Sequence, residues 1–281
     1  MTIERIGFAY NPTSDAATEL SERAAGWCQV RGIAEWQAQA GDLERLRDEL
    51  PSTDALVVLG GDGTFLRAAR AVAEVDVPLL GVNLGKVGFL SKAEEADLEA
   101  VLQCIVAGTY TIDERMVLEG RIMRDGGVDE DERHIALNDI VIARGSLARV
   151  CRLDVSIDDT HLATFIADGL IVASPTGSTG YSFSAGGPIL DPVGRNLVVT
   201  PIAAYLSAFR SVVVSPEQVV RCQVVDAHEA LVSVDGREDL RIAVGDTVEV
   251  RALDRPIRLL EPVGSLSFWD LLRHKVELLP S

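Results

Sequence analysis

The sequence is poor in cysteine and in aromatic residues. The aromatic residues make up 5% of its 281 residues. The four cysteines, Cys28, Cys104, Cys151 and Cys222, are far apart, without a C-x-x-C pair and without a neighbouring histidine. This spacing is typical of buried thiols and argues against a zinc site or a disulfide framework.

Positive charge is also scarce, because 26 lysines and arginines face 43 acidic residues and give a net charge of −17. Such a surface repels the phosphates of nucleic acids and anionic lipids, so we expect neither nucleic acid nor membrane as a partner. An anionic ligand would have to be held locally, by oriented backbone N–H groups, helix N-termini or a few arginines.

Long apolar runs are absent as well. No stretch approaches the roughly 18 apolar residues of a membrane-spanning helix, and the first residues, MTIERIGFAYNP, lack a signal-peptide pattern. We therefore expect a cytoplasmic protein. With 47% hydrophobic residues the chain can form one large core or two modest ones, which excludes disorder.

The first third of the chain alternates between strand-like and helix-like patterns. Strands are predicted at residues 3–10, 33–36, 55–59 and 78–82, and helices at 14–30, 42–50, 64–75 and 94–106. Continuously apolar strands separated by helices are typical of a parallel sheet covered on both faces. We predict an α/β domain over residues 1–107.

The remainder of the chain consists mainly of short β-rich runs separated by turn residues, which indicates a sandwich-like domain over residues 108–265. The predicted runs are 110–124, 136–143, 152–157, 162–166, 170–173, 231–234 and 247–252. The final segment, 266–281, has a helix-like pattern over Ser267–Leu279, and we expect it to pack back on the first domain.

A glycine-rich segment, Gly60-Gly61-Asp62-Gly63-Thr64, lies between the buried strand 55–59 and the following helix. In a parallel sheet this is the strand edge where ligands bind, and glycines followed by a helix start favour phosphate. A carboxylate among such donors suits a base or a hydroxyl acceptor. The alternative is a tight turn in which Asp62 caps the helix.

A second loop, Asn83–Leu90, follows the next predicted strand and therefore opens at the same edge of the sheet. It could cover a flat ring, although a plain strand-to-helix connection remains the alternative. Neither glycine segment has the spacing of the dinucleotide fingerprint or of the P-loop, so an ordinary Rossmann dehydrogenase and a P-loop NTPase are not supported.

Two further segments carry polar residues in unusual places. The stretch Asp168–Pro188 runs from an apolar strand into a series of hydroxyls and glycines around Tyr181, which could bind ribose and phosphate oxygens and a ring. A flexible linker is its alternative. Asn138 and Asp139 interrupt the apolar run 136–143, which indicates either a ligand contact or a strand bulge.

Taken in this order, the segments G-G-D-G-T, L-N-D and D-G-L-I-V-A-S-P-T-G-S-T-G-Y-S-F-S-A-G-G-P resemble the NAD kinases. That family phosphorylates the 2′-hydroxyl of the adenosine ribose of NAD and so makes NADP. The resemblance implies an α/β domain and a β-rich domain with the site between them, in a homodimer or homotetramer. It also implies Mg²⁺ arriving with the phosphoryl donor, ATP or polyphosphate, and no residues are assigned as metal ligands.

The resemblance also assigns roles to residues. Asp62 resembles the proton acceptor of the family. The positions that match NAD contacts are Gly63, Arg67, Asn138, Asp139, Arg149, Asp168, Thr179, Gly180, Tyr181, Ser182 and Ser184. The positions expected to orient the donor phosphates are Gly60, Gly61, Thr64, Thr176, Gly177 and Ser178.

Two of these assignments carry further detail. Asp168 matches the aspartate that contacts the nicotinamide end, commonly of an NAD reaching in from a neighbouring subunit. Gly180 stands where the family usually has alanine. A lipid kinase of the same superfamily, which shares G-G-D-G-T, and a non-catalytic NAD-binding regulator stay as alternatives.

Overall fold

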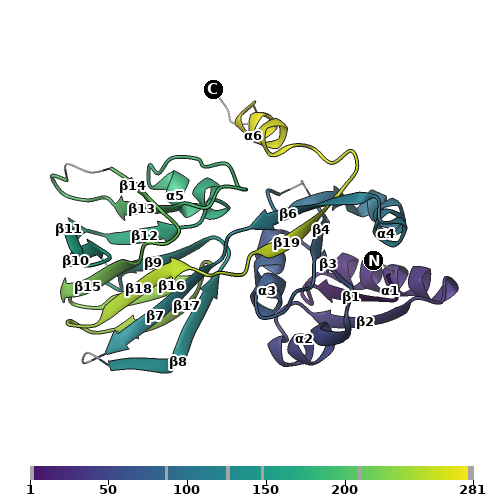
Figure 1. Cartoon of the computed structure of the whole chain (residues 1–281), viewed down its shortest axis with the longest axis horizontal. Helices are drawn as coiled ribbons and strands as arrows, with labels where there is room; N and C mark the ends of the chain where they lie inside the picture. Colours follow the sequence, from purple (N-terminus) through teal and green to yellow (C-terminus); the bar gives the residue numbers. More distant parts are fainter. Residues whose placement is uncertain (1–2, 86–87, 125–126, 147–148, 208–209, 278–281) are drawn as a thin grey trace. The chain divides into compact units, whose positions relative to one another are not determined.

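The computed structural model describes residues 3–85, 88–124, 127–146, 149–207 and 210–277. Contacts within the chain divide it into two units, which are drawn in Figure 1. Unit 1 contains residues 1–114 and 257–281, and unit 2 contains residues 115–256. The domain limits predicted from the sequence, at residues 107/108 and 265/266, stay a prediction.

Unit 1 is built on a seven-stranded sheet with the order β2-β1-β3-β4-β19-β6 and with β5 beside β4 (Figure 1). The strands are β1 Arg5–Tyr10, β2 Ala34–Gln39, β3 Ala55–Leu59, β4 Leu79–Asn83, β5 Ser91–Glu94, β6 Tyr110–Arg115 and β19 Ile257–Pro262. β3 pairs in parallel with β1 and β4, and both β3 and β4 are buried along their whole length. The predicted α/β sheet is confirmed, with parallel pairing from β2 through β1, β3 and β4 to β19.

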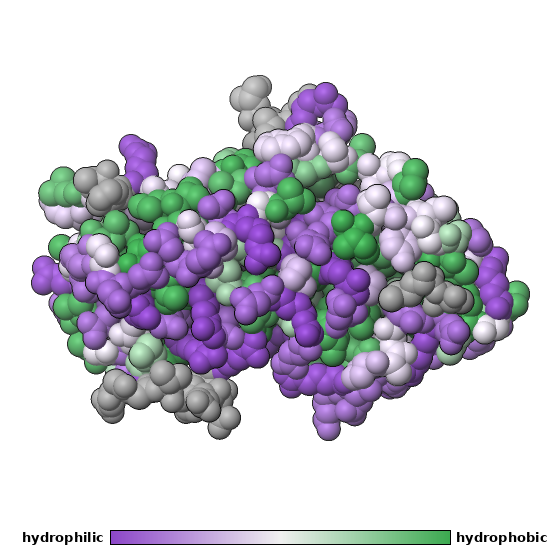
Figure 2. Space-filling view, in the orientation of Figure 1, coloured by the Kyte–Doolittle hydropathy of each residue, from purple (hydrophilic) through white to green (hydrophobic). Residues whose placement is uncertain are grey.

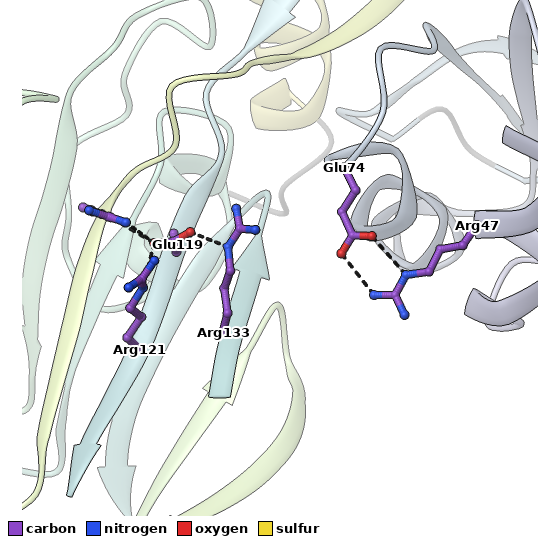
Figure 3. Close-up of polar contacts among 6 residues, drawn as sticks. Arg47, Glu74, Glu119, Arg121 and Arg133 are labelled. Carbon is purple, nitrogen blue, oxygen red and sulfur yellow. Dashed lines mark hydrogen bonds and ion pairs between the residues drawn. The ribbon is translucent and has the colours of Figure 1, made fainter. Parts of the chain in front are cut away.

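Helices cover both faces of this sheet. These helices are α1 Asp15–Val30, α2 Leu43–Glu49, α3 Asp62–Val72 and α4 Leu98–Ala107. The unit also contains α6 Phe268–Glu277 and the 3-10 turns η1 Leu50–Ser52 and η2 Glu95–Asp97. α1 and α4 share a core with β1 and β3. Leu80 and Val82 of β4 belong to that core. Side chains alternate between the two faces of a strand, so Gly81, which lies between them, faces the other side of the sheet. Phe65 of α3 lies against Gly81, and α3 therefore covers that other face. Arg47 of α2 forms a bidentate ion pair with Glu74, just after α3 (Figure 3).

Side-chain caps fix the start of two helices. Ser14 Oγ accepts a hydrogen bond of 3.3 Å from Ala17 N–H, and Asp42 Oδ1 accepts one of 3.2 Å from Arg45 N–H. The predicted helices over 14–30 and 42–50 are thereby confirmed. The helix predicted over 94–106 begins only at Leu98, because the preceding residues form β5 and η2.

Unit 2 is a sandwich of two six-stranded sheets, with the orders β11-β10-β15-β18-β7-β8 and β14-β13-β12-β9-β16-β17. The first sheet contains β7 Leu118–Arg124, β8 Gly127–Ala136, β10 Cys151–Ile157, β11 Thr160–Ala167, β15 Val220–Asp226 and β18 Thr247–Ala252. The second contains β9 Asp139–Arg144, β12 Gly169–Ala173, β13 Leu197–Ile202, β14 Val212–Val214, β16 Ala230–Val234 and β17 Arg237–Ile242. Their facing sides share one apolar core, as predicted for a sandwich.

Two of the predicted β runs are wrong, because neither forms a single continuous strand. Residues 110–124 form two strands, of which β6 belongs to the sheet of unit 1 and β7 to unit 2. The run 136–143 is also broken, because residues 137 and 138 form a bend between β8 and β9. Since β8 and β9 lie in different sheets, the polar pair marks the point where the chain passes from one sheet to the other.

Glu119 of β7 is a carboxylate of unit 2 that binds three arginines. Its side chain is 2% exposed and accepts hydrogen bonds from Arg121 Nε at 3.0 Å, from Arg251 Nε at 2.9 Å and from Arg133 (Figure 3). Burial alone would raise the pKa of Glu119, but the bonds and charges of Arg251 and Arg133 outweigh it and lower the pKa. The cluster joins β7, β8 and β18.

The surface is mixed in character. Figure 2 shows hydrophilic residues over much of one face, with hydrophobic areas between them. All four cysteines are free thiols, three of them buried and Cys104 half-buried. Within the described ranges, no helix has both the length and the apolar character needed to cross a membrane.

Candidate active site

The glycine-rich turn joins the carboxyl end of β3 to α3. Gly60 has φ +152°, and a Cβ atom there would lie 2.6 Å from Thr64 Oγ1, so only glycine fits. Gly61 is the N-cap of α3, and Asp62 is its first residue. Thr64 is buried, and its N–H donates to Gly61 O at 2.9 Å. The start of the helix therefore lies at the edge of the sheet where ligands bind, as the sequence predicts.

Asp62 is held by the neighbouring loop. Its Oδ2 accepts a hydrogen bond of 3.2 Å from Phe89 N–H, and its Oδ1 accepts one of 3.4 Å from Leu90 N–H. A Cβ atom on Gly88 would lie 1.9 Å from Asp62 Oδ1. The alternative in which Asp62 caps its own helix is wrong, because Gly61 occupies that position.

The loop Asn83–Leu90 therefore has a defined role beside the glycine-rich turn, although its residues 86 and 87 lie outside the described residues. It follows β4, the neighbour of β3 in the sheet. Arg67, one turn further along α3, is half-buried. Its Cδ atom lies near Gly41, because a Cβ atom built on Gly41 would be 3.8 Å from it. Asp62 and Arg67 thus lie on successive turns at the start of α3.

In unit 2, the bend at residues 137–139 is fixed by Asp235. Its Oδ2 accepts a hydrogen bond of 2.9 Å from Leu137 N–H, and its Oδ1 accepts bonds of 2.7 Å from Asn138 N–H and 3.2 Å from Asp139 N–H. Asp235 N–H in turn donates to Asp139 O at 3.0 Å. Asp235 has φ +51° in the turn between β16 and β17, and Gly236 follows it with φ +69°. One carboxylate therefore shapes the backbone that presents Asn138 and Asp139.

Asp139 and Asp235 form a buried acidic pair. Burial, followed by the negative charge of Asp235, raises the pKa of Asp139 to about 7. Burial also raises the pKa of Asp235, against the opposing effects of three backbone N–H groups and of Arg237. The pair therefore retains a proton at a higher pH than free aspartates would.

The hydroxyl-rich segment packs against the same bend. Ser174 Oγ donates to Leu137 O and accepts a hydrogen bond of 3.2 Å from Gly177 N–H, while Ser174 N–H donates to Asn138 O at 2.8 Å. A Cβ atom on Gly177 would lie 2.0 Å from Asn138 O, so glycine is required for this close approach. The structure thus brings together two segments that the sequence predicts as parts of one site.

The hydroxyls of this segment differ in accessibility. Ser178 Oγ donates to Pro175 O at 2.6 Å, and Ser182 Oγ lies 3.3 Å from Thr200 Oγ1, both within the protein. Thr179 and Gly180 are half-buried and Thr176 is buried, whereas Tyr181 is 48% exposed. The exposed Ser184 ends the short helix α5, Tyr181–Ser184, which follows the 3-10 turn η3, Gly177–Thr179.

Asp168 directly precedes β12, at the end of this strand that is farther from Asp139. Asp139 pairs with Ala173 at one end of the β9–β12 ladder, and Ala143 pairs with Gly169 at the other end, so the two acidic residues are separated by about 17 Å of strand. Asp168 Oδ1 accepts a hydrogen bond of 2.7 Å from Arg144 Nε, and its Oδ2 accepts one of 3.3 Å from Arg144 Nη2.

Arg149 is exposed in the loop after β9 and therefore lies at the Asp168 end of the ladder. The predicted site residues thus fall into three groups: the glycine-rich turn with Arg67 in unit 1, the Asp139 end of unit 2 and the Asp168 end of unit 2. Sequence reasoning included Gly88 only as part of the second loop, and it missed Arg144 and Asp235 as supporting residues. Only Asp235 carried a local signal, as an Asp-Gly turn.

Two protein-family models match the chain. The model described as the ATP-NAD kinase N-terminal domain matches residues 5–110, and the model described as the ATP-NAD kinase C-terminal domain matches residues 137–261. The fold and the site therefore define a kinase built from these two domains. The chain belongs to the NAD kinase family.

Relatives of nearly the same length support this assignment. An NAD kinase of Heliobacterium modesticaldum is 40% identical over 97% of this chain and 98% of its own length. One of Syntrophotalea carbinolica is 37% identical over 98% of both chains. The predicted activity, phosphorylation of NAD to NADP with ATP, is confirmed, and the lipid-kinase and regulator alternatives are set aside.

Two solved structures share the fold. Yeast NADH kinase complexed with NADH has a TM-score of 0.84 at 22% identity, covering 100% of this chain and 89% of that one. An NAD kinase from Archaeoglobus fulgidus in complex with ATP has a TM-score of 0.78 at 23% identity, covering 98% of this chain and 100% of that one.

Proposed function

We propose that Asp62 accepts the proton of the NAD 2′-hydroxyl while the start of α3 and the turn Thr176–Thr179 orient the donor phosphates. One observation carries this proposal: a half-buried carboxylate at a helix start, oriented by two backbone N–H groups of the adjacent loop. The 2′-oxygen attacks the terminal phosphorus, the bond to the leaving phosphate breaks, and the hydroxyl proton passes to Asp62.

The contribution of the protein is mainly positional. The transition state of phosphoryl transfer is loose and its charge is spread over the phosphoryl oxygens, so geometry and electrostatics account for most of the rate. The first N–H groups of α3 and the positive end of its dipole suit these oxygens. A protein with a net charge of −17 has to bind the donor through such local groups.

Asn138 and Asp139 are proposed to bind the adenosine part of NAD. Gly63, Arg67, Gly180, Tyr181 and the hydroxyls of Thr179, Ser182 and Ser184 are proposed as its further contacts. The structure supports this for the adenosine end, because Gly177 and Ser174 contact the backbone of the Asn138 bend directly.

Asp168 is proposed to contact the nicotinamide end of an NAD bound to another copy of the chain, in a homodimer or homotetramer, and Arg149 is proposed as a further NAD contact. The strand length of about 17 Å between Asp168 and Asp139 supports the separation of these roles. The ion pair with Arg144 would hold the Asp168 carboxylate in place for that contact.

Mg²⁺ is proposed to arrive as part of the donor complex. The described residues contain no group of three His, Cys, Asp or Glu side chains that could form a protein cage for a metal. A donor phosphate chain beside one carboxylate fits Mg²⁺, which retains several waters and is commonly bound through phosphates and one or two carboxylates. Asp62 is proposed as that carboxylate, and the ion would neutralise phosphate charge.

Asp62→Asn tests the proposal. We expect NADP formation, followed with an NADP-specific dehydrogenase, to fall by about 10²–10⁴-fold while NAD binding stays within about twofold. Asp48→Asn, an exposed carboxylate on α2, is the matched control and should retain full turnover. Near-normal turnover of Asp62→Asn would show that another group accepts the proton, and parallel assays with ATP and polyphosphate would identify the donor.

A further inference from the structure

The C-terminal helix α6 contacts the loop that holds Asp62. The rings of Phe268 and Phe89 have centroids 5.8 Å apart at an interplanar angle of 44°. The Lys275 ammonium lies 4.9 Å from the centroid of the Phe89 ring, within the range of a cation–π interaction. Leu271, on the same helix, is 7% exposed. Phe89 is therefore contacted by two residues of α6 that lie about two helical turns apart.

Phe89 also contacts the candidate base through its backbone. Its N–H donates to Asp62 Oδ2 at 3.2 Å, and the next N–H, of Leu90, donates to Asp62 Oδ1 at 3.4 Å. Both oxygens of the carboxylate are thus oriented by two successive residues of the loop. A shift of this backbone would leave Asp62 without the bonds that fix its direction.

Among its described residues, the loop has an internal hydrogen bond of 3.3 Å from Gly85 N–H to Asn83 Oδ1. It contains Gly85 and Gly88, and glycine backbones lose more conformational freedom on ordering than those of other residues. A more restricted residue at position 88 would displace the Asp62 carboxylate, because its Cβ atom would lie 1.9 Å from Asp62 Oδ1. Contacts from outside the loop add to its rigidity, and Phe89 receives such contacts from Phe268 and Lys275 of α6.

We propose that α6 is a positioning element for catalysis, in which Phe268 and Lys275 fix Phe89 and thereby orient the Asp62 carboxylate. This inference depends on the proposed role of Asp62. Phe268 and Lys275 act through Phe89 and not on the substrates, so their loss should lower kcat and leave the KM for NAD nearly unchanged. A merely structural role of α6 would lower the amount of folded enzyme, measured by circular dichroism and Tm, and would leave kcat per folded enzyme unchanged.

The test compares Phe268→Ala, Phe268→Tyr and Lys275→Gln in the full chain, with Arg273→Ala as the control on the same helix, where Arg273 pairs with Asp270. At saturating NAD and MgATP, we expect Phe268→Ala to lower kcat about tenfold. The KM for NAD should stay within about twofold, and Phe268→Tyr, which keeps the ring, should restore kcat. Lys275→Gln should lower kcat about threefold, whereas Arg273→Ala should not change it.

A second comparison separates this inference from the proposed function. Adding Phe268→Ala to Asp62→Asn should cause no further loss of kcat, because the carboxylate that α6 orients is already absent. If Asp62→Asn is inactive but Phe268→Ala and Lys275→Gln keep normal kcat, α6 has no positioning role and the assignment of Asp62 stands. If Asp62→Asn retains normal kcat, both proposals are wrong. Should Phe268→Ala fail to fold, Lys275→Gln decides by the same readouts.

Discussion

Replacing Asp235 with asparagine tests how the bend at residues 137–139 is held. The substitution keeps the size of the side chain but removes its charge and one of its two acceptor oxygens. If the amide oxygen takes the place of Oδ1, the bonds from Asn138 N–H and Asp139 N–H are kept, and Leu137 N–H faces an NH₂ group instead of an acceptor.

Two effects of opposite sign determine the magnitude. The lost bond to a charged acceptor, with a buried donor left unpaired, destabilises the fold by about 1.5–3 kcal/mol. Removal of a buried charge beside Asp139 offsets part of this loss. We therefore expect a net loss of about 1–2 kcal/mol in the free energy of unfolding near pH 5.

The pH dependence provides the more specific signature. Asp139 has an ordinary pKa of 3.8 that is raised to about 7 in the folded protein, so between these values the folded state binds more protons than the unfolded chain. Its contribution to stability is therefore present at low pH and is lost as the pH rises through about 7, with a slope of up to about 1.4 kcal/mol per pH unit. Without the charge of Asp235, the pKa of Asp139 falls and this slope becomes smaller.

Urea unfolding of wild type and Asp235→Asn at pH 5, 6, 7 and 8 measures both effects, and the KM for NAD, expected to rise about tenfold, reports on the bend. Asp158→Asn is the matched control, since Asp158 also has a positive φ, +52°, and accepts one backbone bond of 2.9 Å, from Val219 N–H. An unchanged pH slope together with an unchanged KM in Asp235→Asn would refute the reasoning.

Three further substitutions follow from contacts in the structure. Gly88→Ala should force the Asp62 carboxylate away, because the new Cβ would lie 1.9 Å from its Oδ1; we expect kcat to fall at least about tenfold with little change in Tm, and a normal kcat would contradict this. Gly180→Ala places a Cβ 3.3 Å from Gly177 O, a contact that a small shift relieves, so Tm should stay within about 2 °C and the KM for NAD within about threefold. Glu119→Gln leaves three arginines facing a neutral group and should cost about 2–3 kcal/mol in urea unfolding at pH 7. Since the pKa of Glu119 is lowered from 4.5, its contribution is present above that value and is lost as the pH falls below it, so the difference between wild type and variant should shrink in acid.

The order of strands and helices in unit 1 could be predicted because local patterns determine it. β3 is apolar at every position and is followed by glycines, and α1 and α2 begin at side-chain caps. Parallel pairing then places the ends of β3 and β4 at one edge, which brought Asp62 and the second loop together in the prediction as in the structure.

The bend at Asn138 could not be predicted in the same way. Its shape depends on Asp235, 97 residues away along the chain, and the apolar residues on both sides of the bend give one continuous strand-like pattern although they belong to different sheets. The partner of Asp168 was missed for a similar reason, because Arg144 becomes its neighbour only through the pairing of β9 with β12. Local patterns do not contain these pairings.

The place of β19 in the first sheet has a consequence for biosynthesis. β19 lies between β4 and β6 in the sheet, yet the ribosome makes it after all of unit 2, which ends at residue 256. A nascent chain that has released only residues 1–114 therefore lacks the strand that joins β6 to the others. Because unit 2 is continuous in sequence, it can complete its fold first, and the unit that begins the chain is the last to be finished.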